Sequence, residues 1–408
     1  MKTFKFALCA VGIALVLAGC GGGGDSTISA PQGRYSSMVV FGDSLSDIGT
    51  YKVGAIAAAG GGKYTINSPT AKNWTETIAA QYSLATPCSA QTGLFSIVPS
   101  LAAVPVQNFP SCRNYAQGSA RVSTPAGPYS VAIQQAIVAS ALKSGATQAQ
   151  ANQAAIAADF GLGVIAAPIV YQMANHLANA GGSYDGRELV TILAGGNDAL
   201  MNLAGVKAAA DGGASAVGAA QFAGWSAGVQ ASVAAGGAAA AGAAQQAAVA
   251  AMTQAATELV AAISAQVIGK GAKYVAVANL PDLSQTPYAA PLDPATKGFI
   301  RILVTTFNAT LKAGLAGKPE VVYIDLYTQA QDQIANPAKY GLNNVTGSAC
   351  AESARNPVSP SALGCTAASL IPGDTSKYMF SDGVHQTPIG NDLIAQAVTK
   401  SIVAANWP

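Results

Sequence analysis

The sequence predicts an α/β fold, a three-layer α/β/α sandwich of the flavodoxin-like kind around a mainly parallel sheet. Short apolar runs rich in Val, Ile or Tyr alternate with long helical segments, which is the pattern of parallel strands joined by crossover helices. A polar or Gly-containing turn follows each run, and ligands of such sheets bind at the carboxyl ends of the strands. The predicted strands are residues 38–41, 188–193, 273–277 and 320–324.

The chain length and composition fit one large domain, which we place at residues 36–408. Half of the 408 residues are hydrophobic and 10% are charged, enough to bury a sizeable core. Two Ala-rich segments, about 134–167 and 206–251, read as helical insertions. The second has two interpretations, a helix pair packed through alanines or a mobile cover whose Phe222 and Trp225 meet a bound ligand.

The N-terminus reads as an export signal. A charged start, an apolar stretch and the ending Leu-Ala-Gly-Cys make residues 1–19 a signal peptide. The ending is similar to the lipobox of bacterial lipoproteins, which implies that Cys20 is acylated and that residues 20–35 form a flexible tether. Gly21 after the cysteine favours the outer membrane. A plain secretory signal is the alternative.

Charge and motif content exclude several classes of protein. Without Lys2 and Lys5 of the signal, 21 Lys and Arg become 19, equal to the 19 Asp and Glu, so the mature chain is near neutral. No basic stripe is present to bind nucleic acid. A lone Gly-x-Gly motif at 161–166 follows no strand, and CxxC and HExxH motifs are absent, so we expect no cofactor and no metal. We expect a monomer.

Four cysteines remain after the signal and the lipid anchor are set aside. All four lie in Pro-, Ser- and Gly-rich stretches of an exported chain, where disulfides form. Three pairings are possible, and the short separations favour Cys88 with Cys112 and Cys350 with Cys365. Both pairs would hold long loops in place.

Two polar motifs at opposite ends of the chain carry the candidate chemistry. Ser44 comes just after the first predicted strand, which ends at residue 41, and Gly42 permits a tight turn between them. The Ser44 hydroxyl would therefore lie at the rim of the sheet. Asp382 precedes His385 by three residues, just ahead of a final helix that Thr387 caps. This spacing lets the carboxylate reach Nδ1 of the imidazole and leaves Nε2 to take a proton from serine.

Two competing features are weaker. The segment 224–228 satisfies the Gly-x-Ser-x-Gly pattern of a nucleophile elbow around Ser226, but no strand precedes it, as that motif requires. His176, the second histidine of the chain, lies in a helical stretch, and we expect it at a helix surface or groove with a structural role.

Four blocks in order resemble those of the SGNH (GDSL) hydrolases, over about residue 36 to the C-terminus apart from the insertions. The resemblance implies Ser44 as nucleophile, His385 as base and Asp382 as its orienting partner. It also implies an oxyanion hole made by the N–H groups of Ser44 and Gly118 and the side chain of Asn197. The blocks are Gly42-Asp43-Ser44-Leu45, Asn114-Tyr115-Ala116-Gln117-Gly118-Ser119-Ala120, Gly195-Gly196-Asn197-Asp198 and Asp382-Gly383-Val384-His385.

Two details of the blocks stay open. Many members of the family carry a second glycine where this chain has Ser119, so the donor is Gly118 or its neighbour. Asp198 is expected to cap the helix that follows it.

The resulting expectation is a serine esterase or lipase that hydrolyses short-acyl or lipid esters through an acyl-enzyme on Ser44. An acyltransferase that delivers the acyl group to an alcohol is one alternative. A surface lipoprotein that binds glycan or lipid without turnover is another, and the complete set of site residues argues against it.

Overall fold

The computed structural model describes residues 35–97, 101–125, 127–128, 131–157 and 166–408. The predicted signal peptide, Cys20 and residues 161–165 of the Gly-x-Gly motif lie outside them. Tyr35, placed at the end of the predicted tether, is buried and packs edge-on against the rings of Tyr82 and Tyr274.

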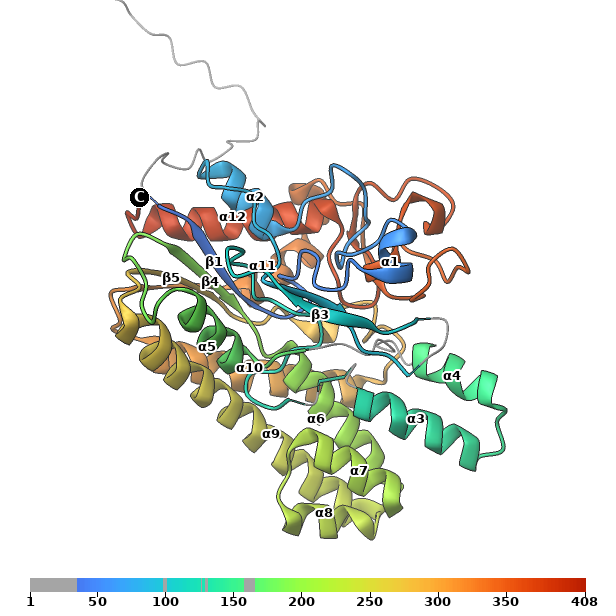
Figure 1. The fold of residues 1–408 in the computed structure, drawn as a ribbon. Helices are drawn as coiled ribbons and strands as arrows, with labels where there is room; N and C mark the ends of the chain where they lie inside the picture. The colour runs from blue at the N-terminus through green and yellow to red at the C-terminus, as the bar shows by residue number, and fades with distance from the viewer. Residues whose placement is uncertain (1–34, 98–100, 126, 129–130, 158–165) are drawn as a thin grey trace, which may run out of the picture.

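A four-stranded parallel sheet forms the centre of the fold (Figure 1). Each of the four strands of this sheet coincides with a predicted run to within a residue or two. The α/β fold with a mainly parallel sheet is confirmed. β1 and β4 are buried along their whole length, because helices cover both faces of the sheet. In sheet order the strands are β1 (Met38–Gly42), β4 (Leu189–Leu193), β5 (Tyr274–Ala278) and β6 (Val321–Ile324).

Helices pack on the two faces of this sheet in separate apolar clusters. One face carries α2 (Trp74–Gln81) and α12 (Pro388–Ala404), and Thr387 caps α12 as predicted. The other carries α5 (Ile169–Asn179), α9 (Gly237–Ala262) and α10 (Pro294–Leu315). Smaller elements of the described chain are α1 (Gly54–Ala58), α11 (Leu326–Ala335), the antiparallel pair β2 (Gln91–Leu94) and β3 (Val104–Asn108), and the parallel pair β7 (Asn344–Ser348) and β8 (Tyr378–Phe380).

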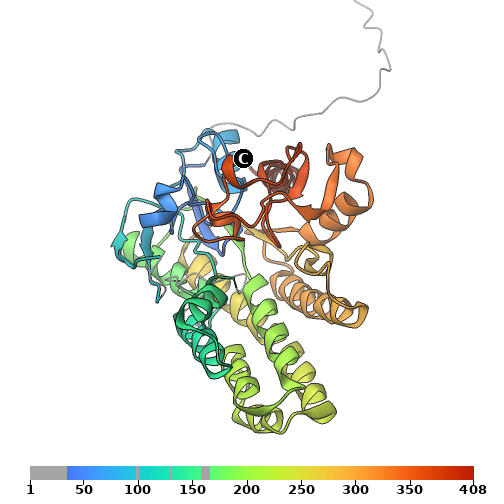
Figure 2. The same ribbon diagram turned by 90° about the vertical axis from the view of Figure 1, so that its right-hand side faces the viewer.

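Both predicted insertions contain helices. The first holds α3 (Val131–Lys143) and α4 (Gln148–Ala157). The second continues α6 (Gly196–Ala209) into α7 (Gly213–Ala223), α8 (Ala227–Ala234) and the start of α9. Figures 1 and 2 both show α7 and α8 projecting away from the sheet.

α9 packs through small side chains. Its buried residues recur about every fourth position, at Ala240, Ala244, Ala248 and Met252, and the helix contacts α6 and α10. With the turns that follow it, the segment Gly237–Lys270 is long and apolar enough to cross a membrane by length and composition. A helix buried in a protein core meets the same criterion, and α9 contributes to the largest core cluster.

Trp225 anchors the second insertion from inside. Its indole N–H donates to Asn202 Oδ1 at 2.7 Å, and a Cβ on Gly205 would come within 2.7 Å of its ring. The side chain is therefore buried, which argues against its proposed part in a mobile cover. Ser226 is the N-cap of α8, so the Gly-x-Ser-x-Gly segment is a turn between two helices.

Candidate active site

β1 has a neighbouring segment on each side, and the blocks that contain Ser44, Gly118 and Asn197 follow the carboxyl ends of these three segments. β4 pairs with β1 on one side. On the other side residues 113–117 run along β1, with the Tyr115 N–H donating to the Val40 carbonyl at 2.9 Å and the Gln117 N–H to the Gly42 carbonyl at 3.1 Å. Ser44 therefore lies between the block that contains Gly118 and the block that contains Asn197.

Close packing holds the turn that presents the nucleophile. A Cβ on Gly42 would lie 2.8 Å from the Leu193 carbonyl oxygen, so the position requires glycine. The Gln172 amide on α5 binds both backbone groups of Gly42, accepting from its N–H and donating to its carbonyl, each at 2.9 Å. Sequence reasoning missed Gln172. A glutamine on the buried face of a helix, beside Ile169 and Met173, was the available signal.

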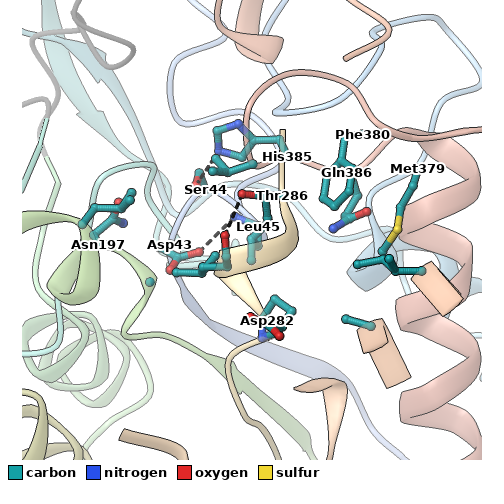
Figure 3. A pocket seen from close by; sticks show the side chains of 17 residues that line it. Asp43, Ser44, Leu45, Asn197, Asp282, Thr286, Met379, Phe380, His385 and Gln386 are labelled. Atoms are coloured by element: carbon teal, nitrogen blue, oxygen red, sulfur yellow. Dashed lines mark hydrogen bonds between the residues drawn. The ribbon is translucent and has the colours of Figure 1, made fainter. Parts of the chain in front are cut away.

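Ser44, His385 and Asp382 form one hydrogen-bonded chain. Figure 3 shows Ser44 and His385 of this chain. Ser44 Oγ lies 2.8 Å from His385 Nε2, and His385 Nδ1 lies 2.7 Å from Asp382 Oδ2. All three side chains are buried, although Ser44 and His385 line a pocket. The structure thus joins the two candidate motifs across 341 positions of sequence.

Backbone donors hold the Asp382 carboxylate. It accepts from the N–H groups of Ala362, Val384 and His385 at 2.6, 3.0 and 2.8 Å. Burial raises the pKa of Asp382, but the charge of His385 and these hydrogen bonds outweigh burial and hold the pKa below its ordinary value. The carboxylate is therefore ionised at neutral pH and fixes the proton of the imidazole on Nδ1.

Both predicted disulfides are confirmed, and one of them supports this carboxylate. Cys350 and Cys365 close the loop that contains Ala362, whose N–H donates to Asp382. Cys88 and Cys112 close the loop that enters the segment along β1.

Tyr64 packs on His385, a contact that the sequence did not indicate. The ring centroids of Tyr64 and His385 lie 4.7 Å apart. The hydroxyl end of the Tyr64 ring leaves no room at Gly118, where a Cβ would come within 2.0 Å of the tyrosine oxygen. Tyr64 therefore explains why position 118 is glycine.

Asn197 lies at the start of α6 and lines the pocket beside Ser44. Its side-chain amide donates to the Ala120 carbonyl at 2.9 Å, which leaves its second N–H for a ligand. Within the described ranges, the Ser44 N–H donates to no protein acceptor. The Gly118 N–H donates to Asp47 Oδ2 at 2.9 Å, so in this structure a carboxylate already holds it. The role of Gly118 toward an oxyanion stays a prediction.

Asp198 does not cap a helix, contrary to expectation. Its carboxylate is buried against Arg121, with Oδ1 3.0 Å from the guanidinium Nε, and it also accepts the Val122 N–H. The same guanidinium donates to the carbonyls of Phe222 and Ala223 at the end of α7. Arg121 thus joins the block after Gly118 to the helical insertion, at the helix end where a cation is favoured.

His176 is structural, as expected, but it lies in the core and not at a surface. Its ring is 4.6 Å from the ring of Tyr184 and 5.4 Å from that of Tyr115, centroid to centroid. Burial, assisted by the charge of Arg113, lowers the pKa of His176 to about 4. The imidazole is neutral at pH 7 and lies outside the site.

The pocket at Ser44 is largely apolar and encloses about 560 Å³, part of it open to solvent. Figure 3 shows Asn197 on one side of Ser44 and His385, and Met379 and Phe380 on the other. In the part of the chain that the structure describes, no lining residue comes from 206–251, which favours the scaffold interpretation of that insertion. The described residues hold no group of three His, Cys, Asp or Glu side chains that could bind a metal.

The fold and the Ser-His-Asp chain define a serine-hydrolase site at the edge of an α/β/α sandwich. Comparison with known families places the protein more closely. The model of the GDSL-like Lipase/Acylhydrolase family matches residues 38–398, and the chain belongs to this family.

Relatives with assigned names match shorter parts of the chain. Esterase EstA of Pseudomonas aeruginosa is 35% identical over 147 residues, which are 33% of this chain and 20% of that protein. Esterase EstA of Pseudomonas putida matches to the same extent. GDSL esterase/lipase APG of Arabidopsis thaliana is 28% identical over 144 residues, 33% of this chain and 40% of that protein. The match thus spans about a fifth of the length of the EstA proteins.

Proposed function

We propose that the protein hydrolyses carboxylic esters through an acyl-enzyme on Ser44. The hydrogen-bonded chain from Ser44 through His385 to Asp382, at the mouth of an apolar pocket, carries this proposal. Family membership and the esterases among the relatives support it. All three side chains come from one polypeptide, so we propose that a monomer suffices.

The first half-reaction forms the acyl-enzyme. His385 Nε2 takes the hydroxyl proton as Ser44 Oγ bonds to the ester carbonyl carbon, and the carbonyl oxygen becomes an oxyanion. The imidazolium that results is stabilised by ionised Asp382. The tetrahedral intermediate collapses, the bond to the alcohol oxygen breaks, and His385 returns the proton to the leaving alcohol.

Water completes the reaction. His385 deprotonates a water that attacks the acyl carbon, and the carboxylic acid leaves as Ser44 recovers its proton. In both halves we propose that the oxyanion accepts from the Ser44 N–H and the Asn197 amide, with a third N–H from Gly118 or the adjacent Ser119.

A product analysis tests the activity. We expect the purified protein to hydrolyse p-nitrophenyl butyrate and to release butyric acid. Addition of an alcohol such as butanol reports on transfer, because an acyltransferase would convert the acyl group into the new ester in preference to the acid. Release of neither product from any ester would contradict the proposal and favour a binding role without turnover.

Asn197→Ala tests the oxyanion hole. We expect kcat to fall by about 10²- to 10³-fold, the usual loss for one oxyanion donor, with little change in KM. Asn336→Ala, at the end of α11, is the matched control and should leave kcat unchanged. An unaltered kcat together with a lowered melting temperature would mean that Asn197 serves only to hold the Ala120 carbonyl.

We further propose that acylation of Cys20 anchors the protein to the bacterial outer membrane. The Leu-Ala-Gly-Cys ending of the signal and the Gly21 that follows support this. In a Gram-negative host, Cys20→Ala should block processing or move the protein from the membrane to the soluble fraction. Radiolabelled palmitate should mark the wild-type chain and not the variant. A wild-type chain that takes up no label would reject the anchor and leave a plain secretory signal.

A further inference from the structure

Gln386 places a buried side-chain amide in the wall of the active-site pocket. It follows His385 directly and lines the same pocket as Ser44. The residue is only 6% exposed. Figure 3 shows Gln386 and Asn197 on opposite sides of Ser44. The mechanism proposed above gives this amide no task.

No protein group within the described ranges hydrogen-bonds with this amide. The oxygen Oε1 is enclosed and has no partner. The nitrogen Nε2 donates to no described acceptor either, but it is not enclosed as the oxygen is. Burying an amide without hydrogen bonds destabilises a fold, so native proteins rarely keep one that serves no purpose. A ligand in the pocket would supply the missing partner.

The packing of α12 fixes which end of the amide faces the pocket. A Cβ on Gly390, in the first turn of α12, would come within 2.6 Å of Gln386 Oε1. The oxygen therefore lies against the N-terminal end of the helix, where the helix dipole favours a negative partial charge. The NH₂ group is directed away from α12, on the side of the pocket. Because NH₂ is a donor, it selects an acceptor oxygen of the ligand.

The other polar side chains of the pocket wall have partners in the protein. Thr286 donates to a backbone carbonyl, and Asp43 and Asp282 accept from backbone N–H groups. Outside the residues already assigned to catalysis, Gln386 is thus the described wall residue whose polar side chain is available to the substrate.

The role of His385 relates Gln386 to the alcohol part of an ester. When the acyl-enzyme forms, the oxyanion points toward Asn197, and His385 Nε2 gives its proton to the oxygen of the leaving alcohol. That oxygen must therefore lie beside the imidazole. The alcohol then extends from His385 toward the residue that follows it, on the side away from Asn197.

We propose that the Gln386 amide binds a hydroxyl oxygen in the alcohol part of the substrate. The proposal rests on the ester hydrolysis proposed above and adds the substrate class, esters of polyols such as glycerol. A hydroxyl group on the carbon next to the esterified one accepts from Nε2. A simple alkyl alcohol leaves the amide without a partner.

Gln386→Met tests the proposal with a side chain of similar length that donates no hydrogen bond. Titration of the released acid gives kcat/KM for 2,3-dihydroxypropyl butyrate and for propyl butyrate, which differ only in two hydroxyl groups. The ratio of the first value to the second should fall by about three- to tenfold in the variant, the contribution of one hydrogen bond. Gln246→Met, at an exposed position of α9, is the matched control and should keep the wild-type ratio.

A third ester, propyl 3-hydroxybutyrate, carries its hydroxyl group on the acyl part. Its kcat/KM relative to propyl butyrate should be the same in Gln386→Met and in wild type. An unchanged ratio for the glycerol ester, or a larger fall for the hydroxybutyrate, would overturn the assignment of Gln386 while turnover of propyl butyrate upholds the proposed function. A wild-type protein inactive on all three esters would overturn both. If Gln386→Met melts well below wild type, Gln386→Leu replaces it in the comparison.

Discussion

Ser44→Ala is expected to lower kcat for p-nitrophenyl butyrate by about 10⁶-fold, the loss found when a serine hydrolase loses its nucleophile. The hydroxyl is the group that bonds to the acyl carbon, and its oxygen lies 2.8 Å from His385 Nε2. The alanine variant has no group to take its place. The oxyanion donors would remain, so a residual rate above that in water should persist. Stopped-flow traces should also lose any burst of p-nitrophenol.

Ser226→Ala is the control for this loss. Ser226 accepts the Val229 N–H as the N-cap of α8, so its removal should cost stability of about 1 kcal/mol and leave kcat unchanged. Similar activity in wild type and Ser44→Ala would show that another residue performs the chemistry. Loss of activity in Ser226→Ala at an unchanged melting temperature would revive the Gly-x-Ser-x-Gly segment as the nucleophile elbow.

Asp382→Asn should lower kcat by about 10⁴-fold with little change in the fold. The carboxylate accepts from His385 Nδ1 and from three backbone N–H groups. An amide of the same shape has one acceptor oxygen, and its NH₂ group would face a donor. His385 would then adopt the tautomer with its proton on Nε2, which cannot take the proton of Ser44.

A matched control is available on the last helix. Asp392 accepts from Thr77 at an exposed position, so Asp392→Asn should keep wild-type kcat. Thermal melting and the kinetics of both variants with p-nitrophenyl butyrate would make the comparison. An Asp382→Asn enzyme within about tenfold of wild type would mean that the backbone alone orients His385.

Arg121 connects the helical insertion to the surroundings of the site. Trp225 lies inside the insertion, and within the described chain the pocket has no wall from 206–251. The guanidinium of Arg121 connects the end of α7 to Asp198, the neighbour of Asn197. The insertion therefore supports the side of the site that contains Asn197, because a buried cation needs all of these acceptors.

The sequence by itself determined the four strands of the central sheet, the order of the four family blocks and the candidate Ser-His-Asp triad. Short β-branched runs ended by glycine and polar residues indicate buried parallel strands, since each run reports on its own environment. Ser44 after a strand, and Asp382 three residues before His385, are likewise local patterns. The disulfide pairing was also predictable, because the closed loops are short.

Only the tertiary structure decided which distant side chains support these groups. Gln172 binds Gly42 across 130 positions, and Arg121 meets Asp198 across 77. Tyr64 packs on His385, and Gly118 gives its N–H to Asp47. These partners follow from how helices and loops pack on the sheet. A polar residue on a buried helix face indicates that a partner exists, but the sequence pattern does not identify which residue it is.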